Sequence, residues 1–572
     1  MTDVPDLISF RLRVGVTGHR ELRDVRELEK AVASVLDQVS DRFAPERTPV
    51  VFRAVSPIAE GADRLVARTV LKRPDADLIV LLPFPPERYL QDFATETSKA
   101  EFKSLFEQAV SHRVVTGEFR LSDEECYERI GRDVVDQTDV LIALWDGQPA
   151  RGLGGTASIL DFARGGSVES GSSASTATGL RRWRKNDRGD PGGRRIPVFV
   201  VRTDRHGAIE TRFDARDWDE VRAAYAELDH FNHFQAPKRM SRRVAARSRA
   251  ELRGPLESLR ATGPDAAELA RVEAITARLE SWVLPAFCKA DSGARSFRNE
   301  AAAIGVGTAL FAAAAVGAAA ARVVLLPRAS ILTWLEVGFM AVVLGGRLAV
   351  MRRRAHRRWV SFRALAEILR VMPYIALAHP ADSSGLNVGG VRDARGGRPP
   401  TVQLEWFRRT VEEVWKHRPP IRLNTADIAW LHKHTVALWI GGQIDYHQRR
   451  SDQHRIWHRL LRGGVLGAFA GTLVCALLDA LDQGGEITVF LTIGLPALGG
   501  ALSYIEGHRE HGRHAERYSW TLTQLVELKR RGDRATNIEE LAVVTRQMLD
   551  LMHTENADWA DVMWVRDVEL AV

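Results

Sequence analysis

The chain has 572 residues, with 80 Lys and Arg against 73 Asp and Glu, a net charge of +7 and 45% hydrophobic residues. This length predicts about three structural units at roughly 100–200 residues each. The apolar fraction excludes low-complexity disorder and collagen, and the presence of only three cysteines excludes a disulfide scaffold. The first ten residues have no signal-peptide pattern, so we expect the N-terminus to stay in the cytosol.

Short apolar runs alternate with amphipathic helical stretches from Phe10 to about Asp204. The five runs are Leu12–Gly18, Val50–Ser56, Leu78–Phe84, Val140–Asp146 and Ile196–Val201. Continuous apolar strands separated by helices are typical of a parallel sheet that is covered on both faces. We therefore predict a Rossmann-like α/β domain over residues 1–210, interrupted by a disordered Ser/Gly-rich insertion at about residues 165–195.

Ligands of such sheets bind at the carboxyl ends of the strands, so the turns after the runs are the candidate site. There Arg20 can pair with a phosphate, Glu60 and Asp63 can accept ribose hydroxyls, and a Gly-Gly-Thr turn at a helix N-terminus can hold an anion. The predicted ligand-binding residues are Thr17, Gly18, His19, Arg20, Ser56, Glu60, Gly61, Asp63, Pro83, Phe84, Asp146, Gly147, Gly154, Gly155 and Thr156.

The expected ligand is derived from a nucleotide, such as an ADP-ribose derivative or a cyclic nucleotide, with Pro83 and Phe84 as an apolar wall for its base. The turn after the first run is not GxGxxG, so NAD redox chemistry is not inferred and no resident cofactor is expected.

The motifs VGVTGHR, SPIAEGADRLVA, LPFPPERYLQDF and GGTA together resemble the SLOG superfamily, Rossmann-like relatives of the LOG nucleotide-processing enzymes and the DprA proteins. LOG-type enzymes place a catalytic Glu three residues after the Thr of the glycine-rich motif. Here Thr156 is followed by Ala157, Ser158 and Ile159. The resemblance therefore implies binding without cleavage, although Glu60 or Asp63 could still serve as the carboxylate of a hydrolase.

Four windows of the second half are almost free of charge: Ala301–Ala321, Ala329–Val350, Gly463–Leu481 and Ile487–Ile505. Each approaches the roughly 20 residues that cross a bilayer core of about 30 Å. Arginines gather after the second window, before the third and after the fourth, which by the positive-inside rule places both termini in the cytosol. We predict four transmembrane helices in two hairpins, in a bacterial cytoplasmic (inner) membrane.

Two features of these windows carry more specific expectations. Glu336 lies inside the second window, where a carboxylate should face a water-filled pore or a partner group. Gly463, Gly467 and Gly471 recur every four residues in the third window, a pattern that lets helices approach closely in lipid.

The membrane half is duplicated, because each hairpin follows a polar-aromatic segment, ADSGARSFR or QIDYH, and precedes an amphipathic helix, Trp359–Arg370 or Ala515–Arg530. We place the modules at residues 290–380 and 439–572, with a helical linker at 211–289 and a linker with helices at 381–438. Beside a SLOG-like domain, these modules resemble SLATT domains, bacterial two-transmembrane modules proposed as pore-forming effectors of antiphage systems. The resemblance implies a homo-oligomeric ion channel gated by a nucleotide second messenger, with no specific nucleic-acid partner.

Two other functions remain open, namely a membrane-tethered nucleotide or N-glycoside hydrolase and a passive membrane anchor. Metal chemistry is not expected at the HREHGRHAER stretch, although it spaces His508, His511 and His514 three residues apart. Its arginines Arg509, Arg513 and Arg517 oppose a cation, so the stretch is better explained as a basic interfacial helix.

Overall fold

The structure is a computed structural model that describes residues 7–114, 122–149, 154–165, 195–203, 209–214, 218–261, 263, 265–326, 329–353, 355–378, 405–421, 423 and 427–565. The chain forms two compact units. The sheet unit comprises Met1–Phe234 and Ala381–Arg418, and the helical unit comprises Gln235–Pro380 and Pro419–Val572. The predicted insertion at residues 165–195 falls almost wholly outside the described residues.

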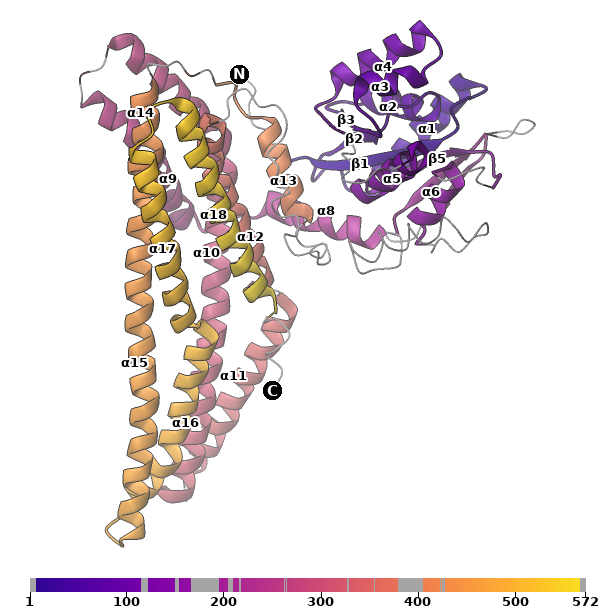
Figure 1. The fold of residues 1–572 in the computed structure, drawn as a ribbon. Helices are drawn as coiled ribbons and strands as arrows, with labels where there is room; N and C mark the ends of the chain where they lie inside the picture. The colour runs from indigo at the N-terminus through magenta and orange to yellow at the C-terminus, as the bar shows by residue number, and fades with distance from the viewer. Residues whose placement is uncertain are drawn as a thin grey trace. The chain divides into compact units, whose positions relative to one another are not determined.

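The sheet unit has seven strands in the order β4-β3-β2-β1-β5-β6-β7 (Figure 1). They are β1 Phe10–Gly18, β2 Val50–Ser56, β3 Asp77–Leu82, β4 Ser111–Val114, β5 Val140–Trp145, β6 Val198–Arg202 and β7 Thr211–Asp214. The first six strands are parallel, and β7 is antiparallel to β6. The predicted Rossmann-like α/β architecture is thereby confirmed, and the strand order reverses direction between β1 and β5.

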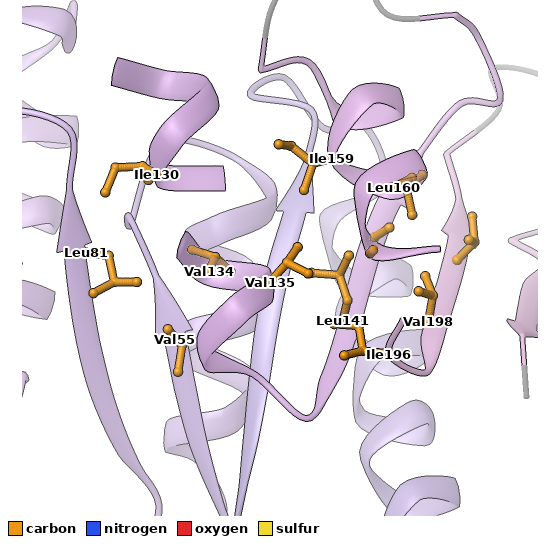
Figure 2. Close-up of a cluster of buried hydrophobic side chains, with 13 residues drawn as sticks. Val55, Leu81, Ile130, Val134, Val135, Leu141, Ile159, Leu160, Ile196 and Val198 are labelled. Carbon is orange, nitrogen blue, oxygen red and sulfur yellow. The ribbon is translucent and has the colours of Figure 1, made fainter. Parts of the chain in front are cut away.

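The helices of the sheet unit pack against its strands. They are α1 Val25–Ser40, α2 Ala62–Leu71, α3 Pro86–Tyr89, the short η1 Leu90–Asp92, α4 Glu96–Gln108, α5 Asp123–Gln137, α6 Thr156–Ala163, α8 Trp218–His233 and α13 Glu405–Lys416. Figure 2 shows α5 and α6 against the sheet, where Val134 and Leu160 meet Leu141 and Val198. Val140 to Leu144 of β5 are fully buried, as a strand covered on both faces requires.

The sheet unit also takes in chain beyond residue 210. Tyr225 of α8 packs 5.5 Å from the ring of Phe10, and the side chain of Asn232 hydrogen-bonds the backbone of Ile8 in both directions. Trp406 of α13 lies 5.7 Å from Phe231. A helix that follows the first apolar hairpin in the sequence is therefore part of the sheet domain.

The helical unit consists of long helices in which distant segments pack side by side. They are α9 Lys238–Arg260, α10 Ala266–Val324, α11 Ser330–Arg353, α12 Ala355–Ala378, α14 Ile428–His432, the π-helix η4 Lys433–Ile440, α15 Gly441–Ala480, α16 Glu486–Arg509, α17 His511–Asp533 and α18 Ile538–Val565. Helix α10 packs on α11, α12 and α16, and α15 packs on α16 and α17 (Figure 1).

Among the described residues, three helical stretches are long and apolar enough to cross a membrane: Ala266–Val324, Ile428–Ala480 and Glu486–Asp533. They contain the first and fourth predicted windows and all of the third except its last residue, Leu481. The described apolar part of α11, Ser330–Gly346, is shorter than that length. Large apolar side chains stand exposed on these helices, such as Trp334 at 74% and Leu466 at 72%, as lipid-facing residues would.

The close approach of α15 and α16 uses a different glycine face from the predicted one. A Cβ on Gly471 would lie 3.0 Å from Leu495 Cδ1, and one on Gly464 would lie 3.0 Å from Leu502 Cδ1, whereas Gly463 and Gly467 have open space. Gly471 therefore lies at the contact between α15 and α16, whereas Gly463 and Gly467 lie outside it, and their part in packing between copies stays a prediction. A strict four-residue spacing drifts about 40° per step around a helix of 3.6 residues per turn, so it leaves the contact face.

Candidate functional site at the carboxyl edge of the sheet

The turns after β1 and β5 meet at the point where the strand order reverses. His19 Nε2 lies 3.2 Å from Asp146 Oδ1 and accepts a 3.2 Å hydrogen bond from the Asp146 backbone N–H. Both side chains are about one third exposed, at 35% and 33%. Burial disfavours the Asp146 carboxylate, but the backbone N–H of Gln148 and the His19 ring hold its pKa below the ordinary value. This pair can therefore accept hydrogen bonds from a ligand.

Two predicted glycines shape this edge by close backbone packing. Gly61 has φ +77, and a Cβ there would lie 2.2 Å from the backbone oxygen of Arg20. A Cβ on Gly18 would lie 2.5 Å from the Cβ of Ala62, whose N–H donates to His19 O at 3.0 Å. The turn after β1 and the start of α2 are thus locked together, which fixes where His19 stands.

The turn after β2 is fastened from within. Ser56 Oγ accepts a 2.9 Å bond from the N–H of Ile58, and Arg64 donates to Ile58 O at 3.1 Å and to Ser98 O at 3.0 Å. The Glu60 carboxylate accepts a hydrogen bond from Ser98 Oγ. Arg64 and Glu60 therefore hold this loop on α4, and Ser56 closes the turn itself.

Asp63 is the buried acid of the edge. It lies in the first turn of α2, is 6% exposed, and accepts a 3.2 Å bond from the N–H of Ala59. Burial raises its pKa to about 7, against the opposing effects of that N–H and of the positive charges of Arg20 and Arg64. At neutral pH the carboxyl can thus either donate or accept a proton, a property that clusters at functional sites.

The predicted apolar wall is covered by two side chains that sequence reasoning did not select. Pro83 and Phe84 are buried, the Arg88 guanidinium lies 3.8 Å from the Phe84 ring centroid, and the Tyr127 ring meets Phe84 edge-on at 5.5 Å. Arg20 lies 5.5 Å from the Tyr127 centroid. Burial and a hydrogen bond to Asp92 raise the pKa of Tyr127 to about 12. A base would meet Tyr127 and Arg88 before it met Phe84.

Little in the sequence pattern marks Tyr127 and Arg88 as part of the candidate site. Tyr127 stands in the polar first turns of α5, and Arg88 stands in the short α3, outside the strand ends that the pattern marks. An aromatic residue between acidic ones in DEECYE is the one signal that could have pointed to Tyr127.

The predicted Gly-Gly-Thr turn begins α6. Gly154 has φ +77, and a Cβ there would lie 2.8 Å from the backbone N of Glu128 in α5. Gly155 is the N-cap and Thr156 the first helical residue. Because α6 follows β5, its N-terminus lies at the carboxyl edge, and its first N–H groups are suited to an anion.

At the opposite, amino edge of the sheet, a network of buried ion pairs connects the strands to α13. Arg11 Nε donates to Glu413 at 2.7 Å, Arg13 Nη2 to Glu412 at 2.9 Å, and Arg53 Nε to Asp77 at 2.6 Å. Arg409 of α13 pairs with Asp139, and their side chains are only 1% and 3% exposed.

Burial alone would raise the pKa values of Asp77, Asp139 and Glu412, but their arginine partners hold all three below the ordinary range. At the end of this network, the ligand atoms of Asp75, Glu413 and His417 lie close enough to one another to hold a metal ion. However, Arg11 pairs with Asp75 and Glu413, and Lys416 pairs with Asp75. The side chains of Arg11 and Lys416 already neutralise these carboxylates, and their positive charges disfavour a metal ion there.

In the helical unit, Glu336 of α11 has an ion-pair partner, since Arg322 Nη2 of α10 lies 3.8 Å from its Oε2. The ADSGARSFR segment meets the amphipathic helix that follows the hairpin: Asp291 accepts from Arg295 at 2.8 Å and lies 3.8 Å from Arg363 of α12. In the second module, the ring of His447 from QIDYH packs 5.5 Å from Tyr518 of α17.

Comparison of the chain with models of known protein families and with curated proteins finds no match. The fold therefore defines the class to which this protein belongs. It is a Rossmann-like α/β domain joined in one chain to a helical unit with three long apolar helices.

Proposed function

We propose that the protein is a membrane effector gated by a nucleotide-derived signal, in a bacterial antiphage or other conflict system. The observation that carries this proposal is the polar set His19, Asp146 and Asp63 at the strand-order reversal of a sheet domain that shares its chain with membrane-length helices. The resemblance of the motifs to SLOG and SLATT domains supports the same conclusion.

The ligand site has the chemistry for a ribose and a phosphate. Asp146 and Asp63 accept hydrogen bonds from hydroxyls, Arg20 and the N-terminus of α6 attract a phosphate, and the Tyr127 ring stacks on a base. We assign the ligand to the ADP-ribose derivatives or cyclic nucleotides. The absence of a Glu at Ala157, Ser158 or Ile159 favours sensing over cleavage.

The effector consists of tandem SLATT-like hairpins, α10 with α11 and α15 with α16, that cross the inner membrane with both termini in the cytosol. We propose that Glu336 lines the pore of a homo-oligomer and that its pairing with Arg322 belongs to the closed state. Opening separates the pair, which exposes a carboxylate to cations.

Helix α13 is our candidate for the link between sensor and pore. In the sequence it stands between the two hairpins, yet buried ion pairs hold it to β1, β2 and the start of β5. A shift of the sheet unit would therefore pull on the chain that leads to both hairpins. A ligand drives such a shift only if it binds the open state more tightly, by about 1.4 kcal/mol for each tenfold change in the equilibrium.

Binding is tested by calorimetry on the full chain in detergent, with a panel of ADP-ribose derivatives and cyclic nucleotides. We expect one class of ligand to bind and Asp146→Asn and Arg20→Ala each to weaken it at least about tenfold, in line with a lost charged hydrogen bond. The control is Lys30→Ala, an exposed α1 residue paired only locally with Glu27. Absence of binding across the panel, or equal affinity of the variants, would contradict the proposal.

A hydrolase is the second candidate, because a buried acid with a pKa of about 7 suits general acid catalysis. Its test is turnover of a nucleoside monophosphate or NAD by the full chain. Turnover that Asp63→Asn abolishes would support the hydrolase and weaken the gating proposal. Since Glu60 is tied to Ser98, Glu60→Gln is expected to have the smaller effect.

A further inference from the structure

Helices α15 and α17 bring three histidines together in the helical unit. His454 comes from α15, and His511 and His514 come from the first turns of α17. The Nδ1 atoms of His454 and His511 lie 2.9 Å apart, and the ring centroids of His454 and His514 are 5.1 Å apart. The sequence analysis considered His508, His511 and His514 and did not connect them to His454.

Two of the three imidazoles already lie close enough to bind one divalent transition metal ion. A zinc ion takes imidazole nitrogens at about 2.0–2.1 Å in a tetrahedron, which places two ligand nitrogens roughly 3.3 Å apart. The observed 2.9 Å needs a widening of only a few tenths of an ångström. His514 is one helical turn beyond His511, with its ring centroid 5.1 Å from that of His454, and its side chain would have to turn toward the pair to supply a third imidazole.

The surroundings hold the rings in place and weaken the charge argument against a cation. His511 is 7% exposed, and the Tyr518 ring packs 5.6 Å from His454. Arg513 points to solvent with 77% of its side chain exposed, and its guanidinium pairs with Glu510 at 2.9 Å. Arg517 and Arg455 are further positive charges near the cluster in the sequence.

We propose that His454, His511 and His514 form a binding site for one divalent transition metal ion of the zinc class. Imidazole nitrogen is a preferred ligand of zinc, copper and nickel, and the partner helices supply it from two directions. The ion would cross-link α15 to α17 directly beside the second apolar hairpin. This inference is independent of the proposed nucleotide site, which lies in the sheet unit.

The test uses the full chain, purified without a polyhistidine tag, stripped with a chelator and titrated with Co²⁺. We expect one cobalt per chain with the intense visible absorption of nitrogen-ligated tetrahedral cobalt, displaced by one equivalent of Zn²⁺. His454→Gln and His511→Gln should each weaken binding at least about tenfold and reduce the band, given that loss of even an outer partner costs 10–100-fold.

The matched control is His417→Gln, which removes the histidine of the Asp75–Glu413–His417 cluster and should leave the spectrum unchanged. Circular dichroism of each variant shows whether it still folds. No visible band in the wild-type chain would overturn the proposal and leave the 2.9 Å contact as an N–H···N hydrogen bond. Unchanged binding in both His454→Gln and His511→Gln would overturn it as well.

Discussion

The two edges of the same sheet treat buried charge in opposite ways. At the amino edge, Asp77 and Asp139 are paired with arginines that hold their pKa values low. At the carboxyl edge, Asp63 is buried and accepts a hydrogen bond from the N–H of Ala59, and burial raises its pKa to about 7 in spite of that bond and of the charges of Arg20 and Arg64. Fully paired charges fasten one helix to one place, whereas a buried acid with a raised pKa is typical of functional sites, which agrees with the proposed role of Asp63.

This contrast separates structural from functional polar groups on physical grounds. Breaking a pair at the amino edge should unfasten α13, while neutralising the acid at the carboxyl edge should stabilise the fold. The variants below, in order of decreasing effect on stability, sharpen or break that division.

Arg409→Ala should have the largest effect, a loss of about 3–5 kcal/mol, because it leaves Asp139 buried without its cation. Hydrogen exchange of the full chain should show faster exchange in α13 and at the start of β5. The control is Arg408→Ala on the same helix, whose side chain is 29% exposed and pairs with Glu405 and Glu412, with an expected cost of about 1 kcal/mol or less. Equal effects of the two substitutions would break the comparison.

Asp63→Asn should stabilise the edge in a pH-dependent way. The folded-state pKa of about 7 lies above the ordinary 3.8, so the folded chain binds more protons and its stability falls as the pH rises from about 4 to 7. Asn stays neutral and avoids that loss, which amounts to at most about 4 kcal/mol for roughly three pKa units at 1.36 kcal/mol each.

The measurement is hydrogen exchange of α2 at pH 5 and pH 8, corrected for intrinsic rates. Protection in Asp63→Asn should exceed that of the wild type clearly at pH 8 and much less at pH 5. A variant that is less protected at pH 8 would mean that the Asp63 carboxylate stabilises the fold.

Gly61→Ala should cost about 2–3 kcal/mol, since a Cβ there meets the backbone of Arg20 and the backbone has φ +77. The measurement is hydrogen exchange in the turn after β1, which should become faster in the variant. Gly263→Ala is the control, because its φ is also positive at +66 but a Cβ there meets nothing within 4 Å. Gly263→Ala should therefore lower the stability by less, because only the positive φ is unfavourable for Ala and no atom clashes with its Cβ.

His19→Gln should have the smallest effect on stability, about 1 kcal/mol or less, because its contact with Asp146 is one third exposed. The same substitution should lower the binding affinity for the nucleotide at least about tenfold, as measured by calorimetry. A large loss of stability with unchanged binding would move His19 to the structural class.

The sheet was predictable because buried parallel strands produce continuous apolar runs, and five of the seven strands coincide with such runs. Predicted glycines were found where backbones touch, at Gly18, Gly61 and Gly154. The attachment of α13 to the sheet could not be predicted from the sequence, because Arg11 and Glu413 are 402 residues apart and no local pattern links them. The same holds for Tyr127 beside Arg20, and for His454 beside His511.

Ion flux from liposomes that contain the full chain tests the central claim most directly. With the nucleotide that calorimetry identifies, we predict a flux at least about tenfold above the unliganded level, lost in Asp146→Asn and restored at higher ligand concentration. Arg409→Ala should bind the ligand but respond weakly, since α13 is unfastened from the sheet. A chain saturated with ligand whose liposomes remain as tight as without it would contradict the account.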